Sequence, residues 1–394
     1  MFAPYRLFGG ALSPYSRKVA SYLRYKGLDF AYIERNADNA EEFAQLAKLP
    51  LLPLLIGADG SVLQDSTPLI ETLEQRHDAP SITPDEAALR FVSLLIEDFA
   101  DEWLNKVLYH YRWSFPEDAR LAAGAIVAAA APEAEAAQVE QAVAQVCAQM
   151  GERRALVGVS DAVASVLEGS LARTLDALQQ VLQVSPFLLG SRPACADFAL
   201  AAQLEELAHG PTAQAQLSAR PAVSAYLARM RAAEGEGAFA GASAQITLLR
   251  PLLEEIAAVY LPWLSANAEA HFSRRESFTV DLAGLMFVQA PQRYAATKAF
   301  PELRARFTAV ADALNEEQTL AFMALSDRLK FVGASERGPA RERERERGEE
   351  VAHAPVESDV EAVEAAGAHE EPSGDPDAQE PAPAHAPAED ADPA

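Results

Sequence analysis

The segment YRLFGGALSPYS, residues 5–16, decides how the chain begins to fold. Its apolar start, residues 5–8, ends at Gly9-Gly10, which is typical of a short strand followed by a break. Ser13 and Pro14 come next, and a capping serine before a proline at the first helical position is a strong helix start signal. The segment therefore predicts a strand, a tight connection and a helix that ends at Gly27.

The same alternation of strand and helix continues through the first eighty residues. Ala58-Asp59-Gly60 separates two short apolar runs and predicts a hairpin turn. The other predicted elements are a strand at 30–34, a helix at 41–48, strands at 51–56 and 62–63, and a helix at 66–77. The expected order is β-α-β-α-β-β-α, an α/β arrangement.

Helical patterns fill most of the rest of the chain. Residues 89–111 place Leu95, Phe99, Trp103 and Val107 at four-residue steps, which predicts a helix with one apolar face. An alanine-rich segment, 120–150, is broken at Pro132 and predicts two helices. Further helices are expected at 163–182, 194–207, 221–233, 244–261, 301–314 and 316–329, with a hairpin formed by 277–281 and 285–289.

Charge sets the last sixty residues apart. The chain has 394 residues with 33 Lys and Arg against 58 Asp and Glu, a net charge of -25. Residues 335–394 hold 5 basic and 18 acidic side chains and no Phe, Tyr, Trp, Leu or Ile. Such a segment cannot bury enough apolar surface to offset its ordering entropy. We predict a disordered acidic tail over residues 334–394.

Composition also limits the partners and the compartment. A strongly acidic chain is a poor match for nucleic acid, because phosphate binding needs a basic surface. No apolar run reaches the ~18 residues needed to span a bilayer, and the first residues lack a secretory signal. Cys147 and Cys195 are too few for a disulfide framework. We expect a cytoplasmic protein with no membrane or nucleic-acid partner.

Four local features resemble the thioredoxin-like domain of the glutathione transferases. They are Ser13-Pro14-Tyr15-Ser16 at the first helix, Leu52-Pro53, the Asp59-Gly60 turn, and Asp65-Ser66 at the start of a later helix. Gly190-Ser191-Arg192-Pro193 and Ala196-Asp197-Phe198 resemble the helical second domain of bacterial members. The chain is thus similar to glutathione S-transferases that carry serine at the thiol position, with a C-terminal extension.

The resemblance implies a division of the chain into four parts. A thioredoxin-like, glutathione-binding domain is expected at 1–78 and an all-helical domain at 84–235. A mostly helical extension with a small hairpin follows at 244–333, before the acidic tail. The resemblance also implies glutathione as co-substrate, no metal, and a possible homodimer.

Ser13 is the candidate for the thiol-binding residue. A free thiol has a pKa of about 8.5, so a thiolate at neutral pH needs preferential stabilisation of the anion. The amino end of a helix offers unpaired N–H groups and partial positive charge, and the Ser13 hydroxyl would add one hydrogen bond. Capping alone would also explain Ser13. Tyr5 and Ser16 are the reserve hydroxyls.

Ser13-Pro14-Tyr15-Ser16 also resembles the Cys-Pro-Tyr-Cys motif of glutaredoxins, with both sulfurs replaced by oxygens. Serine cannot form a mixed disulfide. The sequence therefore argues against dithiol redox chemistry and cysteine-type thiol transfer.

Further residues are expected around the peptide of glutathione. The resemblance favours a cis bond before Pro53, which would turn the Leu52 backbone toward a peptide-like ligand. A helix amino end binds anions, so Ser66 is expected at the γ-glutamyl carboxylate and Asp65 at its ammonium. The full predicted set is Leu52, Pro53, Asp65, Ser66, Arg17 and Lys48. Helix capping remains the alternative for Asp65 and Ser66, and a solvated surface cation for Arg17 and Lys48.

Four ring side chains on the 89–113 segment are candidates for a second-substrate pocket. They are Trp103, Tyr109, His110 and Trp113, which would line the cleft between the domains if the helix packs as in the family. Core packing is the more common use of such side chains. The neighbouring carboxylates at 97, 98, 101 and 102 indicate an acidic helix face, without a histidine pattern that favours a metal.

Two functions follow from these observations. The first is an enzyme that conjugates glutathione thiolate to an apolar electrophile held by aromatic and aliphatic side chains. The second is a non-catalytic binding or scaffold module with the same fold, which Leu51 in place of the family's basic residue and the long extension favour. The sequence leaves the electrophile and the occurrence of turnover open.

Overall fold

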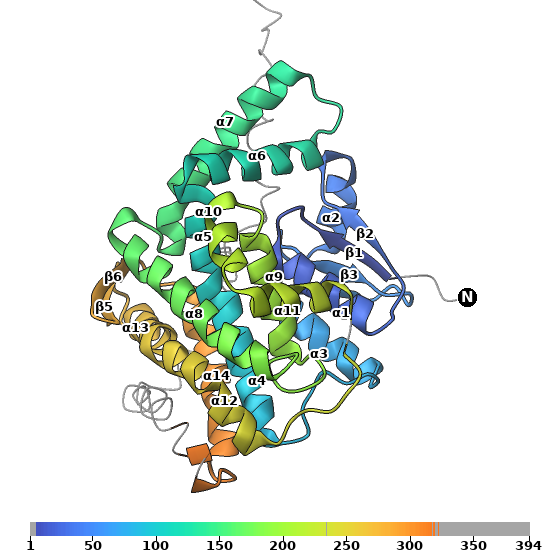
Figure 1. Cartoon of the computed structure of the whole chain (residues 1–394). Coiled ribbons are helices and arrows are strands. Elements are labelled where there is room, and N and C mark those ends of the chain that lie inside the picture. The colour runs from blue at the N-terminus through green and yellow to red at the C-terminus, as the bar shows by residue number, and fades with distance from the viewer. Residues whose placement is uncertain (1–4, 234, 317, 320–321, 323–394) are drawn as a thin grey trace, which may run out of the picture.

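The computed structural model describes residues 5–233, 235–316, 318, 319 and 322 and contains a small sheet beside a large body of helices (Figure 1). The predicted tail at 334–394 lies outside the described residues, as does most of the helix predicted at 316–329.

The N-terminal domain has the predicted order of elements. Its helices are α1 (Pro14–Tyr25), the short η1 (Ala37–Asn39), α2 (Ala40–Leu46) and α3 (Ser66–Arg76). Its strands are β1 (Tyr5–Gly9), β2 (Phe30–Glu34), β3 (Leu54–Ile56) and β4 (Val62–Gln64), arranged β2-β1-β3-β4. Strand β1 pairs parallel with β2 and antiparallel with β3, and β3 pairs antiparallel with β4. This mixed sheet confirms the thioredoxin-like fold.

Alternation along the strands buries both faces of the sheet. Leu7 and Leu55 belong to the main hydrophobic core with the buried side chains of α1 and α3. Phe8 and Leu54, one residue away, belong to a smaller cluster in which Phe8 lies 5.8 Å from Phe43 of α2, measured between ring centroids. Because successive strand residues point to opposite faces, a short apolar run supplies both layers.

The second domain is built on one long rod of three consecutive elements. They are α4 (Ala87–Phe99), η2 (Ala100–Leu104), which is a wide π turn, and α5 (Asn105–Ser114). Around them lie α6 (Pro116–Ala130), α7 (Ala136–Arg153), η3 (Arg154–Val157), η4 (Asp161–Val163), α8 (Ala164–Val184), α9 (Cys195–Leu207), α10 (Pro211–Ser218) and α11 (Pro221–Arg231). The alanine-rich α6 and α7 form a hairpin that projects from one end of the molecule (Figure 1).

Helix α9 joins the two domains. It packs against both α1 and α4, and Phe198 of α9 lies 5.9 Å from Tyr22 of α1 between ring centroids. Asp197 of α9 accepts hydrogen bonds from the backbone N–H groups of Leu188 and Ala194, at 3.0 and 2.8 Å. This packing fixes the position of α1, and with it Ser13, relative to the helical rod.

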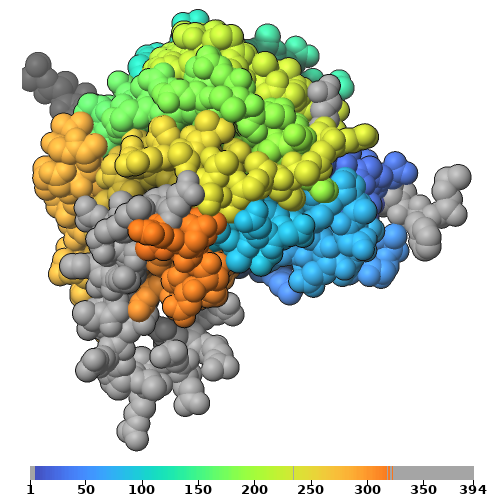
Figure 2. Space-filling view, turned by 60° about the horizontal axis from the view of Figure 1, so that its bottom comes forward, coloured from blue at the N-terminus to red at the C-terminus, as the bar shows by residue number. Residues whose placement is uncertain are grey.

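The C-terminal extension is part of the same body. Its elements are α12 (Ala242–Glu255), η5 (Ile256–Tyr260), α13 (Leu261–Phe272), β5 (Phe278–Leu282), β6 (Leu285–Gln289), η6 (Ala295–Ala299) and α14 (Phe300–Ala311). Helix α12 packs on α8, and α14 packs on α4, where Phe307 lies 5.2 Å from Phe91 between ring centroids. In Figure 2 the orange α14 segment adjoins the light-blue segment around α3 and α4.

Buried residues of the extension belong to the same hydrophobic core as those of the helical domain. The predicted boundaries 1–78, 84–235 and 244–333 stay predictions. In the described part of the chain, no single helix is long and apolar enough to cross a bilayer. One bent pair, residues 136–157 with 161–184, has the length and composition of a span when the two stretches are taken together.

Candidate functional site

A cavity of about 420 Å³ lies where the N-terminal domain, the α4–η2–α5 rod and the extension meet. We call it the main cavity. The N-terminal domain contributes the amino ends of α1 and α3 and the loop before β3, and the extension contributes side chains of η6 and α14. The predicted residues that line it are Ser13, Leu52, Asp65, Ser66, Lys48 and Tyr109. The structure therefore brings part of the predicted site together around one cavity.

Ser13 is both a helix cap and a cavity residue. Its Oγ accepts a hydrogen bond from the Ser16 backbone N–H at 3.2 Å and another from the Ser16 hydroxyl at 3.0 Å. With both of these bonds accepted, the proton of the Ser13 hydroxyl has no acceptor among the described residues. The two roles weighed for this serine do not exclude each other, because capping uses the oxygen and leaves the hydrogen to donate.

The two reserve hydroxyls lie elsewhere. Ser16 is fully buried behind Ser13, where its oxygen also accepts from the Gly10 N–H at 3.4 Å. The Tyr5 hydroxyl is hydrogen-bonded to His77 Nε2 at 2.9 Å, and Tyr5 does not line the main cavity. Of the three candidate hydroxyls, Ser13 is the one at the cavity surface.

The loop before β3 presents an unused stretch of backbone. The Leu52–Pro53 bond is cis, as expected. Neither the N–H nor the C=O of Leu52 is hydrogen-bonded to another described residue. The Gln64 side chain of β4 holds the loop in place by donating hydrogen bonds to the carbonyls of Leu49 and Leu51, at 2.6 and 2.7 Å. Leu52 thus lines the main cavity from a braced loop, with its backbone N–H and C=O unpaired among the described residues.

The amino end of α3 forms the next part of the wall. Asp65 precedes the helix with a positive φ of 74° and makes no capping hydrogen bond with its side chain. Ser66 is buried, and its hydroxyl has no hydrogen-bond partner among the described residues. The Asp65 carboxylate is paired with Lys298 of η6, whose Nζ lies 2.9 Å from Oδ2. No pattern in the sequence predicted this contact between Asp65 and the extension.

A buried ion cluster connects the two domains beneath the main cavity. Lys18 of α1 is fully buried, and its Nζ lies 2.6 Å from Glu97 Oε1 and 2.6 Å from Asp101 Oδ2. It also donates to Thr67 Oγ1 at 3.1 Å. Burial opposes the charge on Lys18, but the two carboxylates outweigh it, so the pKa of Lys18 lies above its usual value.

The helical wall of the main cavity is polar. Asp98, Glu102, Asn105 and Tyr109 all line it. Burial and the neighbouring carboxylates raise the pKa of Asp98 to about 7, although a hydrogen bond from Tyr260 at 2.5 Å favours its charged form. Burial also raises the pKa of Glu102. The main cavity therefore combines polar groups with aromatic and aliphatic side chains, and the second-substrate pocket stays a prediction.

Three of the four ring side chains predicted for the second substrate face the helical bundle instead. Trp103 is fully buried and donates from Nε1 to Ser170 Oγ at 2.9 Å. His110 is hydrogen-bonded to Glu168 at 3.0 Å, and Trp113 is also buried. Only Tyr109 of the four lines the main cavity. Helical periodicity accounts for Trp103 and His110, which point away from the face that carries positions 98, 102, 105 and 109. Trp113 lies one turn beyond Tyr109 on the same face, 6.3 Å from it between ring centroids, and does not line the main cavity.

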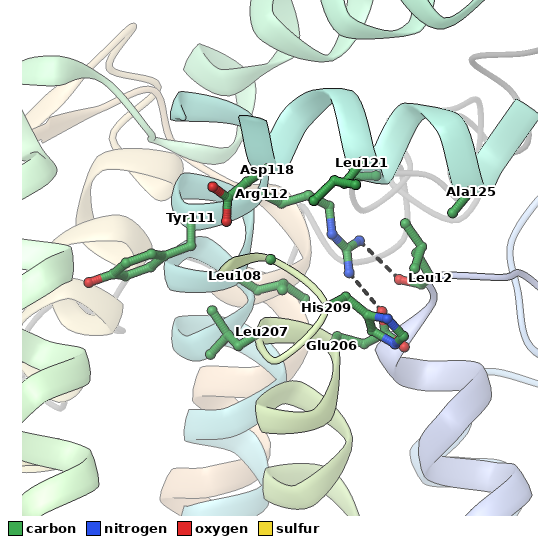
Figure 3. Close-up of a pocket in the computed structure, with 12 residues that line it drawn as sticks. Leu12, Leu108, Tyr111, Arg112, Asp118, Leu121, Ala125, Glu206, Leu207 and His209 are labelled. Carbon is green, nitrogen blue, oxygen red and sulfur yellow. Dashed lines mark hydrogen bonds and ion pairs between the residues drawn. The ribbon is translucent and has the colours of Figure 1, made fainter. Parts of the chain in front are cut away.

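Arg17 serves the domain interface. Its Nε donates to Glu206 Oε1 of α9 at 2.6 Å, and it does not line the main cavity. Glu206 also accepts from Arg112, whose other nitrogen donates to the Leu12 carbonyl at 2.9 Å (Figure 3). Leu12, Arg112 and Glu206 line a smaller cavity of about 190 Å³. The bond from Arg112 to the Leu12 carbonyl fixes the backbone just before Ser13.

Sequence reasoning missed Lys18, Asp98 and the residues of the extension. The polar residues at 98, 102, 105 and 109 fall at helical spacing, and that stripe is the signal that could have identified the cavity face of the rod. Nothing comparable marks Tyr294 or Lys298. Among the described residues, no group of three or more His, Cys, Asp and Glu side chains is arranged to hold a metal ion.

Comparison with known proteins gives two family matches. Residues 7–81 match the glutathione S-transferase N-terminal domain, and residues 133–229 match the glutathione S-transferase C-terminal domain. A search of curated protein sequences found no match.

Several solved structures are similar to this chain. A glutathione S-transferase from Rhodospirillum rubrum is 18% identical, covers 74% of this chain and 98% of its own, and has a TM-score of 0.39. A glutathione S-transferase from Methylobacterium radiotolerans, in complex with glutathione sulfonate, is 21% identical over 58% of this chain and 91% of its own, with a TM-score of 0.37. A beta-etherase from Sphingobium is 18% identical over 58% of this chain and 96% of its own, with a TM-score of 0.44.

The two matched domains occur in the order of the fold described above, a thioredoxin-like sheet domain followed by a helical domain. The chain therefore belongs to the glutathione S-transferase family.

Proposed function

We propose that the protein is a glutathione transferase that binds glutathione in the main cavity and holds its sulfur as a thiolate at Ser13. One observation supports this proposal most strongly. The Ser13 hydroxyl lies at the amino end of α1, keeps its proton free to donate, and opens onto the main cavity that also contains the amino end of α3.

The thiolate would be stabilised by two effects at the same place. The Ser13 O–H donates a hydrogen bond to the sulfur, and the first N–H groups of α1 add partial positive charge. Each unit by which the pKa of the thiol falls corresponds to about 1.4 kcal/mol of preferential anion binding. The Ser16 N–H and hydroxyl both donate to Ser13 Oγ. These two bonds fix the position of the Ser13 oxygen and leave the Ser13 hydroxyl hydrogen to donate to the sulfur.

The rest of the tripeptide would lie along the N-terminal wall. The free N–H and C=O of Leu52 suit the backbone of the cysteinyl residue. Ser66 and the first N–H groups of α3 suit the γ-glutamyl carboxylate, and Asp65 suits its ammonium. Lys48 lines the same wall and suits the glycine carboxylate.

In the reaction, the thiolate sulfur forms a bond to an electrophilic carbon while the bond from that carbon to the leaving group breaks. The leaving group departs with the bonding electron pair, and the thiol proton has already passed to solvent. The carboxylates at 98, 101 and 102 line the remaining volume, so the electrophile should carry polar groups as well as an apolar body.

A second candidate function is a binding module of the same fold without turnover. The pairing of Asp65 with Lys298 favours it, because a proposed ligand contact is already occupied by a side chain of the protein. Homodimer formation, a cytoplasmic location and the disordered tail stay predictions.

Calorimetric titration with glutathione and a thiol-consumption assay with an aryl halide distinguish these functions. We expect saturable binding, and turnover that falls about tenfold to a hundredfold at pH 7 in Ser13→Ala. The deficit should narrow at pH 9, where free thiol ionises without help. A deficit of equal size at both pH values would assign Ser13 to capping alone. Binding without turnover would support the module.

A further inference from the structure

Lys298 is a cation that the extension places against a residue of the proposed peptide site. Its Nζ lies 2.9 Å from Asp65 Oδ2, and 37% of the lysine side chain and 40% of the aspartate side chain are exposed. The two residues are 233 positions apart in the sequence. The contact therefore depends on how the extension packs across the main cavity.

The backbone that carries Lys298 is anchored in the core, while its side chain is partly exposed and lies with Nζ 5.1 Å from the centroid of the Tyr294 ring. Ala295, Ala296 and Ala299 of η6 are buried in the hydrophobic core. Helix α14 follows directly and is held by the packing of Phe307 on Phe91. From this anchored turn, the four-carbon side chain of Lys298 reaches into the main cavity, which it lines.

We propose that Lys298 occupies the ammonium position of the ligand at Asp65, and that it thereby sets the preference of the site between an aminoacyl ligand and one without the amino group. This inference rests on the proposed function, in which Asp65 receives the γ-glutamyl ammonium. A zwitterionic γ-glutamyl group brings a second cation to the Asp65 carboxylate, where it competes with Lys298 for Oδ2. A glutaryl group, which has the carboxylate but no ammonium, leaves the Lys298–Asp65 pair in place.

A displaced Lys298 has another partner nearby. Glu302 lies four positions further along the helical segment, is exposed and lines the main cavity. A lysine and a glutamate at this spacing lie on the same face of a helix. The competition is therefore an exchange of cations at Asp65, in which no charge is left buried without a partner.

The size of the effect follows from exposure. Half-exposed ion pairs contribute little to stability, because water and salt screen them. Displacing Lys298 should therefore weaken glutathione binding by no more than about fivefold. Removing Lys298 should therefore strengthen glutathione binding by up to about fivefold. The same change should weaken the glutaryl ligand, because the Asp65 carboxylate then repels its carboxylate without compensation.

The test compares two ligands by calorimetric titration of the full chain. The ligands are glutathione and glutaryl-cysteinyl-glycine, and the variants are Lys298→Ala and Lys298→Arg. Arg250→Ala is a matched control, since it removes one exposed cation of a surface ion pair on α12. In Lys298→Ala we expect glutathione affinity to rise two- to fivefold and the preference for glutathione over the glutaryl ligand to rise by a larger factor. Lys298→Arg and Arg250→Ala should keep the wild-type preference.

The outcomes separate the inference from the function on which it rests. If glutathione binds but its preference over the glutaryl ligand is the same in wild type and Lys298→Ala, the inference is wrong and the proposed function stands. If an equal rise appears in Arg250→Ala, the effect is one of net charge and the inference is again wrong. If no variant binds either ligand, both the proposed function and the inference are wrong.

Discussion

The main cavity has two walls of different construction. The wall from the N-terminal domain includes the amino ends of α1 and α3 and the residue Leu52, whose backbone N–H and C=O make no hydrogen bond to a described residue, beside side chains such as Lys48 and Asp65. The opposite wall, from the rod and the extension, consists of ionisable side chains such as Asp98, Glu102 and Lys298. The first wall suits a peptide of fixed length, and the second presents charges that depend on their neighbours.

This difference indicates which properties each wall can change. Backbone groups keep their hydrogen-bonding character whatever the side chain is. The wall from the N-terminal domain, which we propose to bind the peptide and call the peptide-binding wall, can therefore carry a side chain such as that of Leu52 without losing these groups. Charges on the helical wall are set by burial and by pairing, so they respond to pH and to the position of the extension. We therefore expect variants of the two walls to differ in kind as well as in size.

The largest effect should come from the residue that joins the walls. Lys18→Met leaves Glu97 and Asp101 as buried carboxylates without their cation, and should lower the free energy of unfolding by about 3–5 kcal/mol. Urea denaturation measures this change. Adding Glu97→Gln and Asp101→Asn to the same chain should recover much of the loss. A loss below about 1 kcal/mol in Lys18→Met would show that the walls do not depend on this cluster.

A smaller effect should appear in the pH dependence of the free energy of unfolding, through Asp98 of the helical wall. The pKa of Asp98 is raised to about 7 by burial, so the folded protein holds its proton more tightly than the unfolded chain does. Between pH 4 and pH 7 the unfolded chain has released this proton, and the stability contributed by the protonated carboxyl is lost as the pH rises. In Asp98→Asn, the fall in unfolding free energy from pH 5 to pH 8 should be smaller by about 1–3 kcal/mol. Identical slopes for wild type and variant, from urea denaturation at several pH values, would contradict the assignment.

On the peptide-binding wall the expected effect is on affinity alone. Ser66→Ala removes a hydroxyl that makes no hydrogen bond within the described part of the protein, so the fold should not change. Glutathione affinity should fall by about fivefold, the equivalent of one hydrogen bond worth about 1 kcal/mol. Ser61→Ala, in the hairpin outside the main cavity, is the control and should bind as wild type does. Equal affinities for all three proteins would remove Ser66 from the site.

The smallest effect should come from Trp113, which lies one helical turn beyond Tyr109 and does not line the main cavity. Trp113 is buried in the bundle, and its Nε1 has no hydrogen-bond partner among the described residues. Trp113→Phe should therefore change glutathione affinity less than twofold and the free energy of unfolding by about 1 kcal/mol or less. A large loss of affinity in calorimetric titration, with stability unchanged, would place Trp113 in the binding site after all.

The sequence predicted the peptide-binding wall better than the helical wall, and the cause is the range of the contacts. Ser13-Pro14 and Asp65-Ser66 are start signals for helices, and a helix start can be recognised from four neighbouring residues. The order of strands and helices followed from such local patterns. A contact such as Lys298–Asp65 has no local pattern, because it forms only when distant segments pack together.

The helical wall also shows what periodicity does and does not determine. Four-residue steps correctly grouped Trp103 with the apolar face of its helix, but they do not say which face meets the cavity. Trp103 lies in the core, whereas Tyr109 lies on the cavity side with Asp98 and Glu102. The burial of Lys18 was missed for a similar reason. A lysine in a helix is expected at the surface, and its two carboxylate partners, Glu97 and Asp101, belong to another domain.

The central claim is that Ser13 and the amino end of α1 hold the sulfur of glutathione as a thiolate. Titration of the ultraviolet absorbance of bound glutathione thiolate, in wild type and in Ser13→Ala, measures this directly. The account predicts a pKa for the bound thiol well below about 8.5 in wild type, and a value closer to that of free thiol in the variant. Identical titration curves for the two proteins, or a bound thiol that titrates as it does in free solution, would contradict the claim.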